Sequence, residues 1–120
     1  MFKYFKREEF ACKCGCGKNE VEDGLIAKLD TAREIAGVPF KINSGYRCEK
    51  NNAEEGGVKA SPHMSGWAAD ISTTDSRTRW LVVEALIQAG FNRIGIGRAF
   101  VHADIDPNKD PDVVWTYYNA

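Results

Sequence analysis

The spacing of hydrophobic residues predicts a helix over residues 22–37. Leu25, Leu29 and Ala32 recur every three or four residues, which places their side chains on one face of a helix. Acidic residues stand at the start of the segment, and Gly37 is suited to end it because glycine readily adopts the left-handed conformation. This helix is expected to serve as scaffold, and we assign it no chemistry.

A second helix is expected over residues 75–90. Either of its first two residues, an aspartate and a serine, can cap the helix start, and its last residue is a glycine that can end it. Trp80, Val83 and Ile87 have helical spacing within this segment. We therefore expect these three side chains to lie in the core rather than to form a binding surface.

Short runs of alternating or β-branched residues predict the strands. They cover residues 40–44, 68–73, 100–106 and 113–118. Glycines within residues 94–97 indicate a turn or hairpin ahead of the third strand. The polar run 49–58, rich in asparagine and glycine, is expected to be a long loop, and such loops often carry function.

The chain has 120 residues, which predicts a single domain spanning residues 1–120. Its formal net charge of −1 argues against a nucleic-acid-binding protein, which usually carries a basic excess. No apolar run approaches the roughly 20 residues that a membrane helix needs, and the first residues lack the apolar core of a signal peptide. We expect a soluble monomer without a membrane partner, located in the cytoplasm as synthesised.

The chain contains four cysteines, of which Cys12, Cys14 and Cys16 alternate along one segment and Cys48 lies in a later loop. Three interpretations compete: a structural zinc held by all four, a disulfide to Cys48, or small buried thiols. Structural zinc sites usually use pairs separated by two to four residues, whereas a single residue separates the neighbouring cysteines here. This spacing, together with the usual burial of cysteine, favours buried or partly paired thiols.

Both histidines and one aspartate are candidate zinc ligands. His63 and Asp70 lie seven residues apart, and His102 lies in the third predicted strand. Imidazole and carboxylate are ordinary zinc ligands, and a catalytic zinc has three protein ligands and one open position. Taken singly, His63 fits a loop histidine with a local partner and Asp70 fits the cap of the following helix. Together, the three residues indicate a small zinc hydrolase.

Two further side chains are candidates for the site. Arg47 follows the first predicted strand, where its planar guanidinium is suited to bind a carboxylate; the alternative is a surface arginine paired with Glu49 or Glu54. Asp104 lies on the same face of its strand as His102, because strand residues two apart point the same way. It is expected to act either as the general base or as the acceptor that orients the imidazole.

Several groups of residues, spread over most of the chain, form one pattern. They are Ser44-Gly45-Tyr46-Arg47, Asn52, Gly57, Ser61-x-His63-x-x-Gly66-x-Ala68-x-Asp70 and Phe100-Val101-His102-x-Asp104. This pattern resembles that of the zinc D-alanyl-D-alanine carboxypeptidase family, the peptidoglycan peptidases found in bacteria and in phage lysins. The resemblance implies an α+β fold of the Hedgehog-like type, in which a small antiparallel sheet is flanked by helices.

The resemblance also implies roles for individual residues. It assigns His63, Asp70 and His102 to Zn²⁺, Arg47 to the carboxylate or backbone of the substrate, and Ser61 to orientation of the bound peptide. The implied reaction is hydrolysis of an amide bond in a peptidoglycan stem peptide, by a D-Ala-D-Ala carboxypeptidase or a lysin-type endopeptidase.

The chain departs from the family pattern near the last histidine. Many members carry Glu or Asp three residues before it, where this chain has Ala99, and the chain resembles the branch with a His-x-Asp arrangement. The alternatives to an enzyme are a zinc-stabilised module that binds cell wall or protein, and an assembly protein. Action on the wall would follow release from the cell, as for a phage or prophage lysin, whereas a cytoplasmic enzyme would trim precursor peptides.

Overall fold

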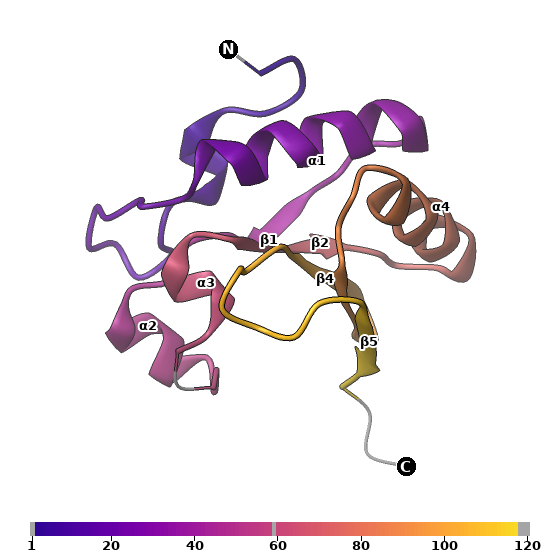
Figure 1. Cartoon of the computed structure of the whole chain (residues 1–120). Coiled ribbons are helices and arrows are strands. Elements are labelled where there is room, and N and C mark those ends of the chain that lie inside the picture. Colours follow the sequence, from indigo (N-terminus) through magenta and orange to yellow (C-terminus); the bar gives the residue numbers. More distant parts are fainter. Residues whose placement is uncertain (1, 59, 118–120) are drawn as a thin grey trace.

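The computed structural model describes residues 2–58 and 60–117, which form a five-stranded sheet with two long helices on one face (Figure 1). The helices are η1 (Arg7–Phe10, a 3₁₀ turn), α1 (Asp23–Ala36), α2 (Glu49–Glu54), α3 (Pro62–Ser65) and α4 (Ser76–Gln88). The strands are β1 (Ile42–Ser44), β2 (Ala68–Ser72), β3 (Arg93–Ile96), β4 (Phe100–Asp104) and β5 (Val113–Thr116). Their order across the sheet is β1-β2-β4-β3-β5.

The α+β class is confirmed, and the sheet is mixed rather than wholly antiparallel. All neighbouring strands pair antiparallel except β3 and β5, which are parallel. The parallel pairing follows from the connection between β4 and β5. The chain reverses direction after β4, at the end of the sheet where β3 begins. There Arg93 pairs with Asp104 on one side and with Val113 on the other. A strand that turns back from β4 and adds beside β3 must run in the direction of β3.

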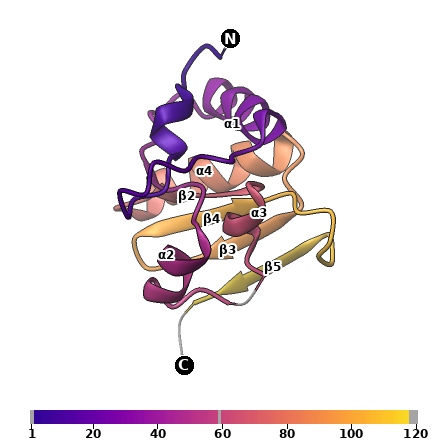
Figure 2. The ribbon, with the colours of Figure 1, turned by 90° about the vertical axis from the view of Figure 1, so that its left-hand side faces the viewer.

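Alternation along β4 separates an apolar face of the sheet from a polar one. Val101 and Ala103 are fully buried in the hydrophobic core with residues of α1 and α4. His102 and Asp104 point to the opposite face, because successive strand residues alternate. Figure 2 shows α2 and α3 on that opposite side, away from α1 and α4. The polar face of the sheet is therefore the side on which β2 and β4 can meet α3.

The buried face of α4 differs from the predicted one. Trp80 and Ile87 are 63% and 59% exposed, so the prediction that they lie in the core is wrong. The helix instead buries Val82, Ala85 and Leu86. Residues 80–83 are all apolar, so the sequence allows either the face with Trp80 or the face with Val82 to be buried. Packing against α1 and β4 buries the face with Val82.

Two short helices lie where the sequence predicts loops. The first, α2, occupies the start of the polar run 49–58, and the thiol of Cys48 caps it by accepting a hydrogen bond from the backbone N–H of Asn51. Cysteine is not among the usual N-cap residues, so the sequence shows little sign of this start. The second, α3, has only four residues, too few to show helical periodicity. Among the described residues, none of the helices has the length and apolar character that crossing a membrane requires.

Candidate metal centre

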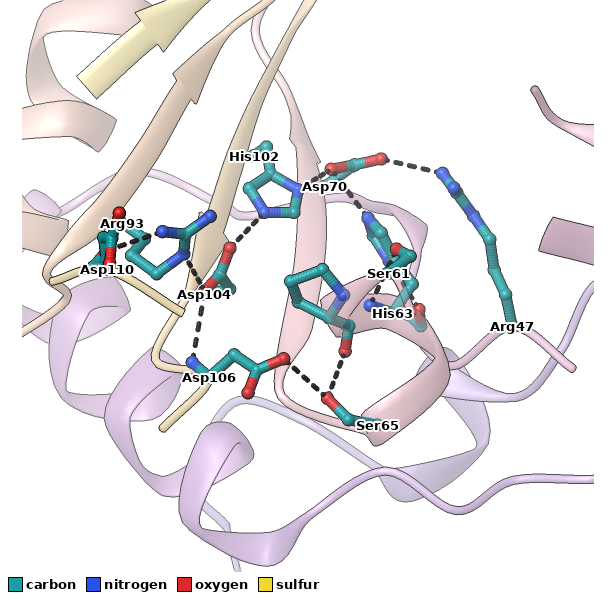
Figure 3. A network of polar contacts seen from close by, with 12 residues as sticks. Arg47, Ser61, His63, Ser65, Asp70, Arg93, His102, Asp104, Asp106 and Asp110 are labelled. Carbon is teal, nitrogen blue, oxygen red and sulfur yellow. Dashed lines mark hydrogen bonds and ion pairs between the residues drawn. The ribbon is translucent and has the colours of Figure 1, made fainter. Parts of the chain in front are cut away.

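His63, Asp70 and His102 come together on the polar face of the sheet (Figure 3). One potential ligand atom from each lies within 4.8 Å of the other two. Asp70 on β2 and His102 on β4 are directly paired in antiparallel register, so both side chains project from the same face. His63 comes from α3, which packs against β2. Three residues predicted as zinc ligands, each on a different element, thus form one cluster.

The segment that carries His63 is a tight helical turn fixed at both ends. Ser61 caps α3, since its hydroxyl oxygen accepts the backbone N–H of His63 at 3.2 Å, and Pro62 follows in the first turn. Gly66 ends α3 with a φ of 84°, and a Cβ at this position would collide with the carbonyl oxygen of Glu20. The serine and glycine of the sequence motif are therefore needed for the start and the end of α3. Ser61 also lines the cavity described below.

Hydrogen bonds fix the orientation of both imidazole rings. Nδ1 of His63 lies 2.8 Å from the carbonyl oxygen of Gly45, which can only accept, so this nitrogen carries the proton. Nε2 of His63 is thereby left with a lone pair, 3.3 Å from Oδ1 of Asp70. On His102, Nε2 lies 2.6 Å from Oδ2 of Asp104 and Nδ1 lies 3.0 Å from Oδ1 of Asp70. One nitrogen of each ring therefore faces the same carboxylate oxygen.

Arg47 holds the other oxygen of Asp70. Its Nη2 lies 3.3 Å from Oδ2 of Asp70, its Nε donates to Ser44 at 3.0 Å, and the side chain is only 12% exposed. The surface pairing with Glu49 or Glu54 that the sequence left open is not among its contacts, whereas Asn52 accepts from Nη1 at 3.5 Å. Arg47 thus lies at the metal centre, as its position after the first strand predicted.

Asp104 contacts the ring nitrogen of His102 that does not face Asp70, and it lines the same cavity as the cluster. It is fully buried, and Oδ1 accepts from Nε of Arg93 at 2.8 Å and from the backbone N–H of Asp106 at 3.1 Å. Both carboxylate oxygens are therefore engaged within the protein. The sequence gives no indication that Arg93 belongs to the site, because a single arginine there matches no motif. Its contact with Asp104 depends on the pairing of β3 with β4, which places the two residues side by side.

Burial and hydrogen bonding act in opposite directions on the protonation of the cluster. Burial alone would raise the pKa of Asp70, but hydrogen bonds and charge interactions with His102 and His63 outweigh it and hold that pKa well below its usual range. Burial alone would lower the pKa of His102, and its hydrogen bonds to Asp104 and Asp70 raise it instead. Asp70 is therefore anionic at neutral pH, as a metal-binding carboxylate must be.

A cavity of about 470 Å³ opens onto the cluster. Its wall carries charged groups of both signs, among them Arg47, Glu55 and Lys109. The volume lies within the range of small-molecule and peptide-fragment sites. The cavity can therefore receive a substrate that bears both anionic and cationic groups.

Aromatic rings from the edge of the sheet close one side of this cavity. The ring of Trp115 lies 5.4 Å from that of His102. The ring of Tyr117 meets that of Trp115 edge-on at 6.2 Å and that of Phe100 at a tilt at 5.1 Å. Gly95 makes this arrangement possible, because a Cβ there would come within 2.8 Å of the rings of Trp115 and Tyr117. Trp115 thus lines the site.

The arrangement fits a catalytic zinc site by its donor chemistry. One nitrogen of each imidazole ring and one ionised carboxylate oxygen converge, and each ligand is oriented through its second polar atom by Gly45, Arg47 or Asp104. Such outer partners are what zinc-binding histidines and carboxylates usually have. Three protein ligands beside an open cavity leave a position for water or substrate.

Comparison with known proteins gives one finding. The model of a family described as Peptidase M15 matches residues 3–106, which include every residue of the cluster and the partners that orient it. A search of curated proteins found no match.

Proposed function

The chain belongs to the peptidase M15 family, a family of zinc-dependent metallopeptidases, and from this premise we propose that it hydrolyses an amide bond in peptidoglycan stem peptides. The observation that carries the proposal is the convergence of His63, Asp70 and His102 on the wall of a cavity. The resemblance of the Ser-Gly-Tyr-Arg and Ser-x-His-x-x-Gly-x-Ala-x-Asp motifs to those of peptidoglycan peptidases supports the choice of substrate.

His63, Asp70 and His102 would hold the zinc ion, since among residues 2–58 and 60–117 they form the group of potential ligands that converges at the cavity. When bound, zinc supplies a Lewis acid that polarises a carbonyl group and activates water for attack. The carbonyl of Gly45 and the carboxylate of Asp104 keep each imidazole in the tautomer that presents its lone pair to the cluster. These two groups therefore position the ligands.

For Asp104 we infer this positioning role in place of the general base, although the sequence left both open. A general base must reach the proton that it abstracts, directly or through one water. The carboxylate of Asp104 borders the cavity but has no exposed surface, and His102 and Arg93 occupy its two oxygens. Arg93 holds the carboxylate in place and the carboxylate contacts the imidazole, which favours the positioning role over that of a general base.

Arg47 is the candidate for recognition of a substrate carboxylate. Its guanidinium lines the cavity and has five N–H donors in a planar fork, of which the contacts to Ser44, Asn52 and Asp70 use only part. A D-alanyl terminus offers a carboxylate that such a fork can bind through two hydrogen bonds. If the enzyme is a carboxypeptidase, amidation of the terminal carboxylate will therefore abolish most of the activity; an endopeptidase will cleave both forms.

The test is incubation of the zinc-loaded chain with purified peptidoglycan and with a stem pentapeptide, followed by mass spectrometry. We expect fragments whose masses identify the cleaved amide, and no fragments after chelation or with the His63→Ala variant. Zinc bound at the cluster without product from either substrate would refute the proposed activity and favour the non-catalytic binding module.

A further inference from the structure

We propose that Cys12, Cys14, Cys16 and Cys48 bind a second zinc ion as a structural site with four thiolate ligands. Their sulfur atoms all lie within 4.8 Å of one another, in a group outside the cavity of the metal centre. This inference is independent of the proposed activity, since it rests on a different set of residues. It concerns the fold around the N-terminal loop and α2.

The distances between the sulfur atoms match a tetrahedral zinc site better than a disulfide. Cys12 and Cys14 are 3.4 Å apart, and each lies 3.6 Å from the sulfur of Cys48. Sulfur atoms bound to one zinc at about 2.3 Å occupy the corners of a tetrahedron with edges of about 3.8 Å. A disulfide would join only two of these three sulfur atoms. It would not explain why the third lies equally close to both.

The backbone explains how cysteines separated by one residue can share a centre. The sequence favoured buried thiols because a single residue separates the neighbouring cysteines and because cysteine is usually buried. Cys12 and Cys48 are buried, but Cys14 and Cys16 are exposed and residues 12–16 turn. Gly15 and Gly17 have φ values of 84° and 79°, which other residues rarely adopt. The reversal at Gly15, between Cys14 and Cys16, bends the loop so that its three sulfur atoms converge.

Backbone N–H groups already point at three of the sulfur atoms. The N–H of Cys48 donates to Cys12 at 3.5 Å, that of Asn51 to Cys48 at 3.4 Å and that of Lys18 to Cys16 at 3.5 Å. Such donors stabilise negative charge on sulfur, as they do on other anionic acceptors. The hollow beside the cluster is lined by three lysines, which outnumber the carboxylates of Glu49 and Glu54 there: Lys13, Lys18 and Lys50. Thiols that bind zinc release their protons to solvent.

The proposed zinc would fasten the segment that supports the metal centre. Cys48 directly follows Arg47, whose backbone N–H donates to the carbonyl of His63 at 3.1 Å. On the other side, the backbone N–H of Tyr46 donates to the carbonyl of Phe10 at 2.8 Å. A metal joining residues 12–16 to Cys48 would therefore hold this segment in place from the N-terminal loop. The same tie anchors the start of α2.

The test is zinc content and zinc X-ray absorption of the full chain, purified with zinc and a reductant. We expect about two zinc ions per chain in the native protein and about one in each of two double variants. Cys14→Ser with Cys16→Ser removes two exposed ligands of the proposed site and leaves the core untouched. His63→Ala with Asp70→Ala removes the other site and should leave a zinc surrounded only by sulfur at about 2.3 Å.

Loss of all zinc from the His63→Ala/Asp70→Ala variant, with a folded chain, would overturn the proposal. So would a full second equivalent in the Cys14→Ser/Cys16→Ser variant, or a disulfide detected by mass in the zinc-loaded native chain. Because zinc content is measured without substrate, an inactive protein with two zinc ions would refute the proposed activity and still support the four-cysteine site.

Discussion

At the scale of single residues, Asp104 is held between His102 and Arg93 and has no exposed surface. Its charge fixes the proton on Nε2 of His102 and so turns Nδ1 toward Asp70. We expect Asp104→Asn, which keeps the shape but removes the charge, to lower zinc affinity roughly 10- to 100-fold. Competition with a chelating dye measures this affinity directly.

Asp106→Asn is the matched control for that experiment. Asp106 is a buried carboxylate close by on the chain, but it accepts hydrogen bonds from Ser65 and the backbone N–H of Asn108 and makes none to His102. Its variant should bind zinc as the native chain does. If Asp104→Asn binds zinc normally and yet loses most of its turnover, Asp104 is the general base and not a positioning residue.

Arg47 contributes both to the hold on Asp70 and to the cavity wall. Arg47→Lys preserves the charge but not the planar fork, so a bidentate contact to substrate is lost. Hydrogen bonds to charged groups are worth about 1.5–3 kcal/mol, which corresponds to a fall in kcat/KM of roughly 10- to 100-fold. Steady-state kinetics on the stem pentapeptide, combined with a zinc assay, separate this loss from a loss of metal. Unchanged kinetics would exclude Arg47 from substrate recognition.

The members of the candidate metal cluster could be identified from the sequence because their side chains are distinctive and few. His63 and His102 are the only two histidines, and their spacing from Asp70 and Asp104 belongs to a specific motif. The partners of these ligands could not be predicted in the same way. The acceptor for His63 is the backbone carbonyl of Gly45, a group that every residue possesses.

At the scale of elements, α4 shows where hydrophobic spacing is ambiguous. Leu86 is fully buried and its neighbour Ile87 is 59% exposed, although both are large aliphatic residues. We expect Leu86→Ala to lower the free energy of unfolding by about 2–5 kcal/mol, because it leaves a cavity in the core. Ile87→Ala should change it by less than about 0.5 kcal/mol. Equal losses in urea unfolding of the two variants would contradict the helix phase described here.

The start of α4 depends on an ionised side chain. The carboxylate of Asp75 accepts the backbone N–H of Thr78 at 2.8 Å and its hydroxyl at 3.0 Å, and both contacts lower the pKa of Asp75. A carboxyl group whose pKa is lower in the folded chain stabilises the fold above its unfolded pKa of roughly 3.9. That stabilisation is lost as the pH falls through the lower, folded pKa.

Asp75→Asn isolates this contribution, since the amide can cap the helix without titrating. Urea unfolding from neutral to acidic pH should show a shallower decline in the variant than in the native chain, with the two curves diverging below about pH 4. Curves of identical slope would mean that the Asp75 carboxylate does not contribute to the acid sensitivity of the fold.

At the scale of the whole molecule, the alternation of side chains along β2 and β4 places the core on one face of the sheet and the chemistry on the other. Helices α1 and α4 cover the first face, while α3 and the aromatic edge at Trp115 frame the second. The two main helices, the hairpin before His102 and the α+β class were predictable from periodicity and motif. The parallel position of β5 was not, because it depends on where the chain turns after β4 and not on any local pattern.

The measurement that most directly tests the account is the rate of stem-peptide hydrolysis as zinc is returned to the chelated chain. We predict no cleavage without metal, a rate that rises until the cluster of His63, Asp70 and His102 is filled, and no recovery in the His63→Ala variant at the same zinc concentrations. Cleavage that persists after complete removal of zinc, or that His63→Ala retains, would contradict the assignment of this cluster as the catalytic metal centre.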